Sequence, residues 1–92
     1  MMNQEQFKQL LAQEGFQDLV IVEREADGYL DMHTHPFEAK ALILEGSIVI
    51  HTENETISCV KGDIFHLGHA KPHTERYGPS GVKYLVGRKS EA

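Results

Sequence analysis

Two histidines stand one residue apart in the middle of the chain. His33 and His35 open the stretch HTHPFEAKALILEG, in which a proline follows the second histidine and a glycine closes an apolar run. In an extended segment, side chains two residues apart point to the same side of the backbone. The two imidazoles are therefore able to chelate one ion, because neutral imidazole is a common ligand of transition metals.

The other histidines are concentrated in the same part of the sequence. The chain has six histidines among 92 residues, and all of them lie between positions 33 and 73. A single pair of this kind also occurs without a metal, so the metal interpretation depends on further ligands.

The composition excludes several classes of partner. Nine basic residues against fourteen acidic ones give a net charge of −5, which does not suit nucleic acid or an anionic membrane surface. The single cysteine, Cys59, cannot form an internal disulfide, and it is expected to be a small buried apolar residue. No run of residues has the length and hydropathy of a membrane span or a signal peptide. We expect a cytoplasmic protein whose partner is a small molecule.

The N-terminal residues are predicted to form one short helix. Within residues 3–14, Phe7 and Leu11 have helical spacing, Asn3 stands at an N-cap position and Gly15 at a C-terminal cap. The apolar stripe is expected to pack on a sheet.

The rest of the chain alternates short β-type segments with turn residues. The segments span residues 18–24, 28–33, 39–45, 47–52, 55–60, 63–67, 72–77 and 82–87. This pattern predicts an all-β, antiparallel sandwich or barrel, with residues 1–16 packing on a single domain formed by residues 17–92. The segment 39–45 is apolar on both faces, so one face is expected to line the interior and the other to be covered by a second sheet or subunit. A homodimer is the partner that this expectation favours.

Two stretches resemble the motifs of the cupin superfamily, whose RmlC-like members are small jelly-roll β-barrels. The first motif, G(x)5HxH(x)3–4E(x)6G, resembles GYLDMHTHPFEAKALILEG, in which Gly28, His33, His35 and Gly46 correspond to its glycines and histidines, with one residue fewer between Gly28 and His33 than in the family. The resemblance implies an antiparallel jelly-roll barrel with a short N-terminal helix.

The second motif of the family, G(x)5PxG(x)2H(x)3N, resembles GDIFHLGHAKPHTER. Gly62 stands at its start, and His73 stands where the family has its third histidine ligand. The resemblance therefore implies a metal site made of His33, His35 and His73.

The sequence departs from the family at the carboxylate of the first motif. Counted forward from His35 or back from Gly46, that position falls on Ala39. Glu38 stands one residue earlier, which on a strand means the opposite face, so it is expected at the surface or rim. The second motif has Gly68 and Ala70 in place of its proline and glycine, with His69 between them.

A site of three imidazoles would hold a divalent transition metal, such as Zn, Fe, Ni, Mn or Cu, and leave positions open for a small polar ligand. With one negative charge fewer, it would bind its metal less tightly and anions more readily. The resemblance implies a metal-dependent oxygenase or isomerase; the alternative is a non-catalytic ligand-binding or sensory protein with a weakened or empty metal site. The fold alone does not decide between an enzyme and a binding protein.

Several further residues are candidates for the ligand pocket, although each also suits a structural or surface role. These candidates are Tyr29, His51, His66 and His69. His69 is also a possible replacement for the carboxylate. Arg24 and Arg76 are candidates for binding an anion inside the barrel or at its mouth.

Overall fold

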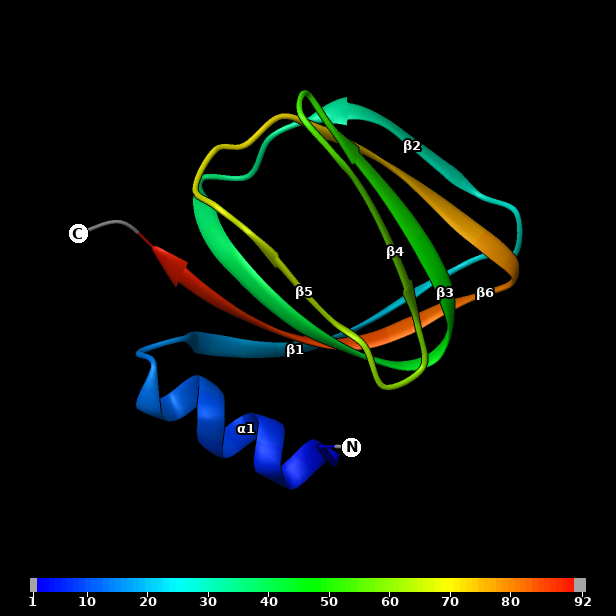
Figure 1. The fold of residues 1–92 in the computed structure, drawn as a ribbon. Helices are drawn as coiled ribbons and strands as arrows, with labels where there is room; N and C mark the ends of the chain where they lie inside the picture. The colour runs from blue at the N-terminus through cyan, green and yellow to red at the C-terminus, as the bar shows by residue number, and fades with distance from the viewer. Residues whose placement is uncertain (1, 91–92) are drawn as a thin grey trace.

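The computed structural model describes residues 2–90, which form one helix followed by six strands (Figure 1). The elements are α1 (Gln4–Gln13), β1 (Gln17–Arg24), β2 (Tyr29–His33), β3 (Phe37–Thr52), β4 (Thr56–Val60), β5 (Ile64–Leu67) and β6 (His73–Ser90). All strand pairs are antiparallel, as predicted. Within the described residues, no helix has the length and apolar character needed to cross a membrane.

Two predicted breaks turn out to be bends within long strands. The predicted segments 39–45 and 47–52 both belong to β3, and the segments 72–77 and 82–87 both belong to β6. The bends lie at Gly46 and Gly81, each with φ of 75°, a backbone conformation that favours glycine. A Cβ added to Gly46 would lie 2.0 Å from the carbonyl oxygen of Gly81, so the two strands can approach closely only because this residue is glycine.

The bends divide β3 and β6 between two layers of the barrel. Beyond the bend, the C-terminal part of β3 pairs with β4 and with the start of β6, which also pairs with β2. The N-terminal part of β3 pairs with β5 and with the end of β6, which also pairs with β1. The main core lies between these layers, and Cys59 is one of its buried residues, as predicted.

The helix covers the outside of one layer (Figure 1). Along β3, Ala41 and Ile43 belong to the interior core, whereas Leu42 belongs to a second cluster with Phe7 and Leu11 of α1. Both of these helix side chains are fully buried. The outer apolar face of residues 39–45 is therefore covered by the chain's own helix, and the expectation that it needs a second sheet or subunit is wrong.

The ends of α1 are as predicted. Asn3 forms a capping box with Gln6, in which each side chain accepts a hydrogen bond from the backbone of the other, at 2.9 and 3.0 Å. Gly15 follows the helix with φ of 84°, the left-handed conformation expected of a C-terminal glycine.

The bend at Gly46 gives a prediction on stability. Gly46→Ala should lower the free energy of unfolding by about 2 kcal/mol or more, because it combines a positive φ with a backbone clash. The measurement is the midpoint of urea unfolding. Gly68→Ala is the matched control, since a Cβ there meets no atom within 4 Å, and it should change stability by less than about 0.5 kcal/mol. Equal midpoints for the two variants would contradict the role given to Gly46.

Candidate metal centre

Three histidines from two distant parts of the chain meet at one end of the barrel. His33 ends β2 and lies opposite His73, the first residue of β6, while His35 lies in the short connection to β3. The centroid of the His33 ring is 4.2 Å from that of His73 and 4.8 Å from that of His35. The structure thus brings together the three histidines that the two motifs single out.

A fourth residue, Glu75, completes the cluster. Its Oε2 atom lies 3.0 Å from Nε2 of His33 and 3.1 Å from Nε2 of His73. One ligand atom from each of the four residues lies within 4.8 Å of all the others. Glu75 is only 6% exposed, so its charge is held inside the protein. Sequence reasoning missed this residue, although it stands two positions after His73 and therefore on the same face of the strand.

The hydrogen bonds of the two histidines leave acceptors facing one another. Nδ1 of His33 donates to the carbonyl oxygen of Asp31 at 2.6 Å, and Nδ1 of His73 donates to the carbonyl oxygen of Lys71 at 2.8 Å. Because a carbonyl only accepts, each Nδ1 carries the proton, and each neutral imidazole has its lone pair on Nε2. Two lone pairs and a carboxylate oxygen therefore converge, and only a cation, either a proton or a metal ion, stabilises that arrangement.

The spacing of these atoms fits a metal ion. Two ligand atoms about 2.1 Å from one ion and at tetrahedral or octahedral angles are separated by about 3.0–3.4 Å. The two distances to Oε2 of Glu75 fall in this range. Backbone acceptors on the distal nitrogens are also typical of metal-binding histidines, since they fix the tautomer and the orientation of the ring.

Tyr77 orients the carboxylate from the other side. Its hydroxyl donates to Oε1 of Glu75 at 3.0 Å, which leaves Oε2 for the histidines. Burial, with the charge of Glu75 next to it, raises the pKa of Tyr77 to about 12, so the phenol remains a donor at neutral pH.

His35 connects the cluster to the barrel interior. Burial, together with the neighbouring His33 and His73, lowers the pKa of His35, which favours the neutral form that a ligand needs. Its ring stacks on Phe37, with centroids 5.0 Å apart and planes 17° from parallel.

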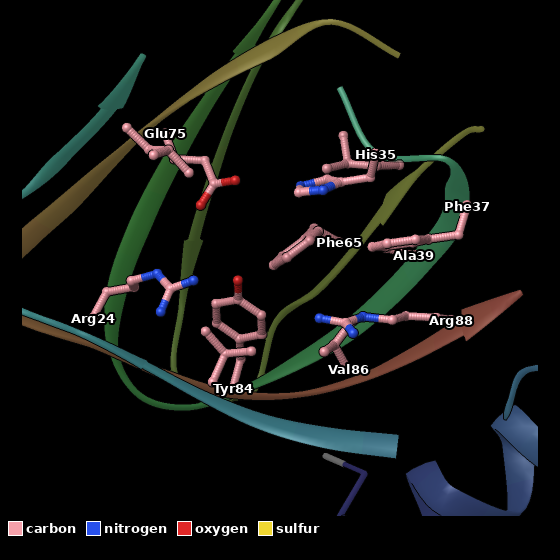
Figure 2. Close-up of a pocket in the computed structure, with 12 residues that line it drawn as sticks. Arg24, His35, Phe37, Ala39, Phe65, Glu75, Tyr84, Val86 and Arg88 are labelled. Atoms are coloured by element: carbon pink, nitrogen blue, oxygen red, sulfur yellow. The ribbon is translucent and has the colours of Figure 1, made fainter. Parts of the chain in front are cut away.

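A cavity of about 70 Å³ adjoins His35 and Glu75 (Figure 2). Most of its wall is apolar or aromatic, but two arginines face into it. The lining residues are Val22, Arg24, Leu30, His35, Phe37, Ala39, Phe65, Leu67, Glu75, Tyr84, Val86 and Arg88.

The position of the missing family carboxylate lies in this wall. Ala39 lines the cavity, so its small side chain leaves space beside the cluster. Glu38 lies on the other side of the strand, where its carboxylate contacts the imidazole of His66. Glu38 is therefore no member of the cluster, in agreement with the alternation of the strand.

The structure does not bring the four pocket candidates to this cavity. Tyr29 is 51% exposed and carries the guanidinium of Arg76 over its ring, on the outside of the barrel. His51 is exposed and contacts the hydroxyl of Thr56. His66 is exposed because it lies on the face of β5 opposite the buried Phe65 and Leu67, and His69 is exposed in the turn that follows this strand. Of the two arginines considered, Arg24 lines the cavity; Arg88, which sequence reasoning missed, is the second.

No protein-family model matches this sequence, and no curated protein matches it. Solved structures do match its fold. A protein of unknown function from Rhizobium leguminosarum has a TM-score of 0.75 and 18% identity, over 79% of this chain and 69% of that one. A cupin superfamily protein from Desulfitobacterium hafniense has a TM-score of 0.69 and 19% identity, over 79% of this chain and 66% of that one.

A third match is the DMSP lyase DddQ from Ruegeria pomeroyi. Its TM-score is 0.74 and its identity 23%, over 84% of this chain but only 40% of the lyase. At identities below 25%, these likenesses concern the fold and not the activity. The chain thus has the jelly-roll fold of these cupin structures, as its two motifs predicted.

Proposed function

We propose that this protein binds one divalent transition metal through His33, His35, His73 and Glu75, and holds a small polar molecule in the adjoining cavity. The observation that carries the proposal is the convergence of Nε2 of His33, Nε2 of His73 and Oε2 of Glu75 on one point. The donor set of three imidazoles and one carboxylate suits Zn, Fe, Ni, Mn or Cu.

In this proposal, the carboxylate ligand comes from β6 and not from β3, where the family motif has it. Ala39 on β3 cannot bind a cation, whereas Glu75 on β6 supplies an oxygen to the same cluster. The site then has the same charge as one with the family's glutamate. The main reason for expecting a weakened or empty metal site, the loss of that glutamate, is thereby removed.

Each protein side chain would have a different role at the site. His33 and His73 are fixed by backbone carbonyl groups, Glu75 is oriented by Tyr77, and the apolar cavity wall limits the water around a bound molecule. A divalent metal held there would polarise an oxygen of the bound molecule as a Lewis acid.

A metal-dependent oxygenase or isomerase reaction is the finer form of the proposal. Oxygen uptake and product formation with small thiols, diketones and aromatic acids test it directly. Turnover that requires the metal would identify an enzyme. If metal-loaded protein neither takes up oxygen nor forms product with any of these compounds, the result would favour the alternative of a non-catalytic binding or sensory protein.

The proposal makes a prediction on the metal content of the protein. Protein made without a histidine tag should bind about one equivalent of a divalent transition metal, measured by inductively coupled plasma mass spectrometry after dialysis. His73→Ala and Glu75→Gln should each weaken binding at least about 100-fold, because the first removes a ligand and the second removes the negative charge of a ligand.

Two matched controls separate loss of a ligand from loss of a histidine or a charge. His51→Ala and Glu38→Gln make the same chemical changes outside the cluster, so both should keep the affinity of the unchanged protein. The metal site is misassigned if the controls lose metal as the cluster variants do, or if no variant changes its metal content.

The proposal also predicts that a carboxylate at position 39 can partly replace that of Glu75. Glu75→Ala should lose the metal, and adding Ala39→Glu should restore about ten-fold or more of the lost affinity, because position 39 lines the cavity beside the cluster. Competition with a chromophoric chelator measures both affinities. Adding Ala39→Gln to Glu75→Ala is the control, since it fills the space without the charge. Equal affinities for the two double variants would show that a carboxylate at position 39 does not reach the metal.

A further inference from the structure

We propose that the molecule bound in the cavity is a small organic carboxylate, with its carboxylate group on Arg88 and Arg24 and an apolar body directed toward the metal cluster. The proposal names the ligand class of the proposed metal site and therefore rests on that function. It comes from the two arginines in the cavity wall, which are not among the proposed metal ligands.

Arg88 lines the cavity, and its guanidinium points into it (Figure 2). Its Nε atom is buried and has no hydrogen-bond acceptor among the described residues. A buried donor without an acceptor costs about 1–3 kcal/mol, and more for a charged group, so a ligand that supplies an acceptor gains correspondingly. No ion pair within residues 2–90 neutralises this guanidinium. The fork of a guanidinium matches a carboxylate through two parallel hydrogen bonds.

The guanidinium is also held in place before a ligand arrives. Arg88 lies over the ring of Phe37, at 4.8 Å from its centroid, and Phe37 in turn stacks on His35. Phe37 and His35 thus form a continuous wall that runs from Arg88 to the metal cluster (Figure 2). A ligand lying along this wall would have one end at Arg88 and the other beside His35.

Two more polar groups point into the same space. Figure 2 shows the guanidinium of Arg24 and the hydroxyl of Tyr84 directed toward the middle of the cavity. Burial raises the pKa of Tyr84 well above its usual range, so its hydroxyl stays protonated and can donate. Arg24 lines the cavity and is also exposed to solvent.

The charge of the cavity is opposite to that of the whole protein. Two guanidinium groups face one carboxylate, Glu75, before any metal is counted, whereas the chain carries a net charge of −5. A metal ion would add to the positive side. The rest of the wall is apolar, and the cavity of about 70 Å³ is far smaller than the roughly 300–1,000 Å³ of drug-sized pockets. These properties select a small anion with an apolar body.

The test compares acids with their uncharged amides. Calorimetric titration of metal-free and metal-loaded protein with propionate, butyrate and benzoate, and with the matching carboxamides, measures the preference for the negative charge. At least one acid should bind about ten-fold or more tightly than its amide in the metal-free protein, where no metal charge contributes to the preference. Equal binding of acids and amides, or no binding of either, would overturn the proposal.

Variants of single arginines show which residue causes the preference for acids over amides. Arg88→Met should reduce it about ten-fold, Arg88→Lys should keep part of it, and Arg76→Met, on the outside of the barrel, should leave it unchanged. Circular dichroism and urea unfolding establish that each variant is folded. An unchanged preference in folded Arg88→Met would contradict the role of Arg88.

Metal analysis of the same samples distinguishes the two proposals. Protein that binds metal but does not prefer acids would refute the ligand class and leave the metal site standing. Protein that prefers acids but never binds metal would refute the metal site and leave the anion site standing.

Discussion

Two imidazole nitrogens and one carboxylate oxygen converge in this protein, and all three are hydrogen-bond acceptors when both imidazoles are neutral. Nε2 of His33 and Nε2 of His73 each lie about 3 Å from the same oxygen of Glu75, and backbone carbonyl groups keep the protons of both rings on the far nitrogen. Such an arrangement is unfavourable unless a positive charge lies at its centre. The pairing of β2 with β6, the connection that carries His35, and the hydrogen bond from Tyr77 all serve to hold these acceptors together.

The same strand that supplies the carboxylate also supplies the anion-binding group that we propose. β6 carries Glu75 before its bend and Arg88 after it, so the bend places opposite charges in different layers around one cavity. Ala39 leaves the space between them open. The substitution at this position therefore has a second consequence, because a glutamate there would place a negative charge beside Arg88, its neighbour across β3 and β6.

The sequence allowed the fold to be predicted more completely than the site. The helix caps at Asn3 and Gly15, the antiparallel strands and the burial of Cys59 all follow from local chemistry. The sequence pattern did not predict that residues 39–45 and 47–52 form one strand bent at Gly46, because a glycine after a charged residue is typical both of a turn and of a bend. The covering of residues 39–45 by α1 depends on contacts between distant segments, which a local pattern does not contain.

Within the site, the grouping of His33, His35 and His73 followed from the resemblance to two motifs. Glu75 could have been found from its spacing to His73, but the family pattern directed the search to position 39. Arg88 had no comparable signal: it faces the cavity because β6 pairs with both β1 and β3, and these contacts join residues far apart in the chain.

The most direct test of the account is the position of the metal. A crystal of metal-loaded protein, measured at the absorption edge of the bound element, should give one anomalous peak about 2.0–2.2 Å from Nε2 of His33, Nε2 of His73 and Oε2 of Glu75, with His35 completing the set. A peak at another place, or bonds to the three histidines with Glu75 turned away, would contradict the account.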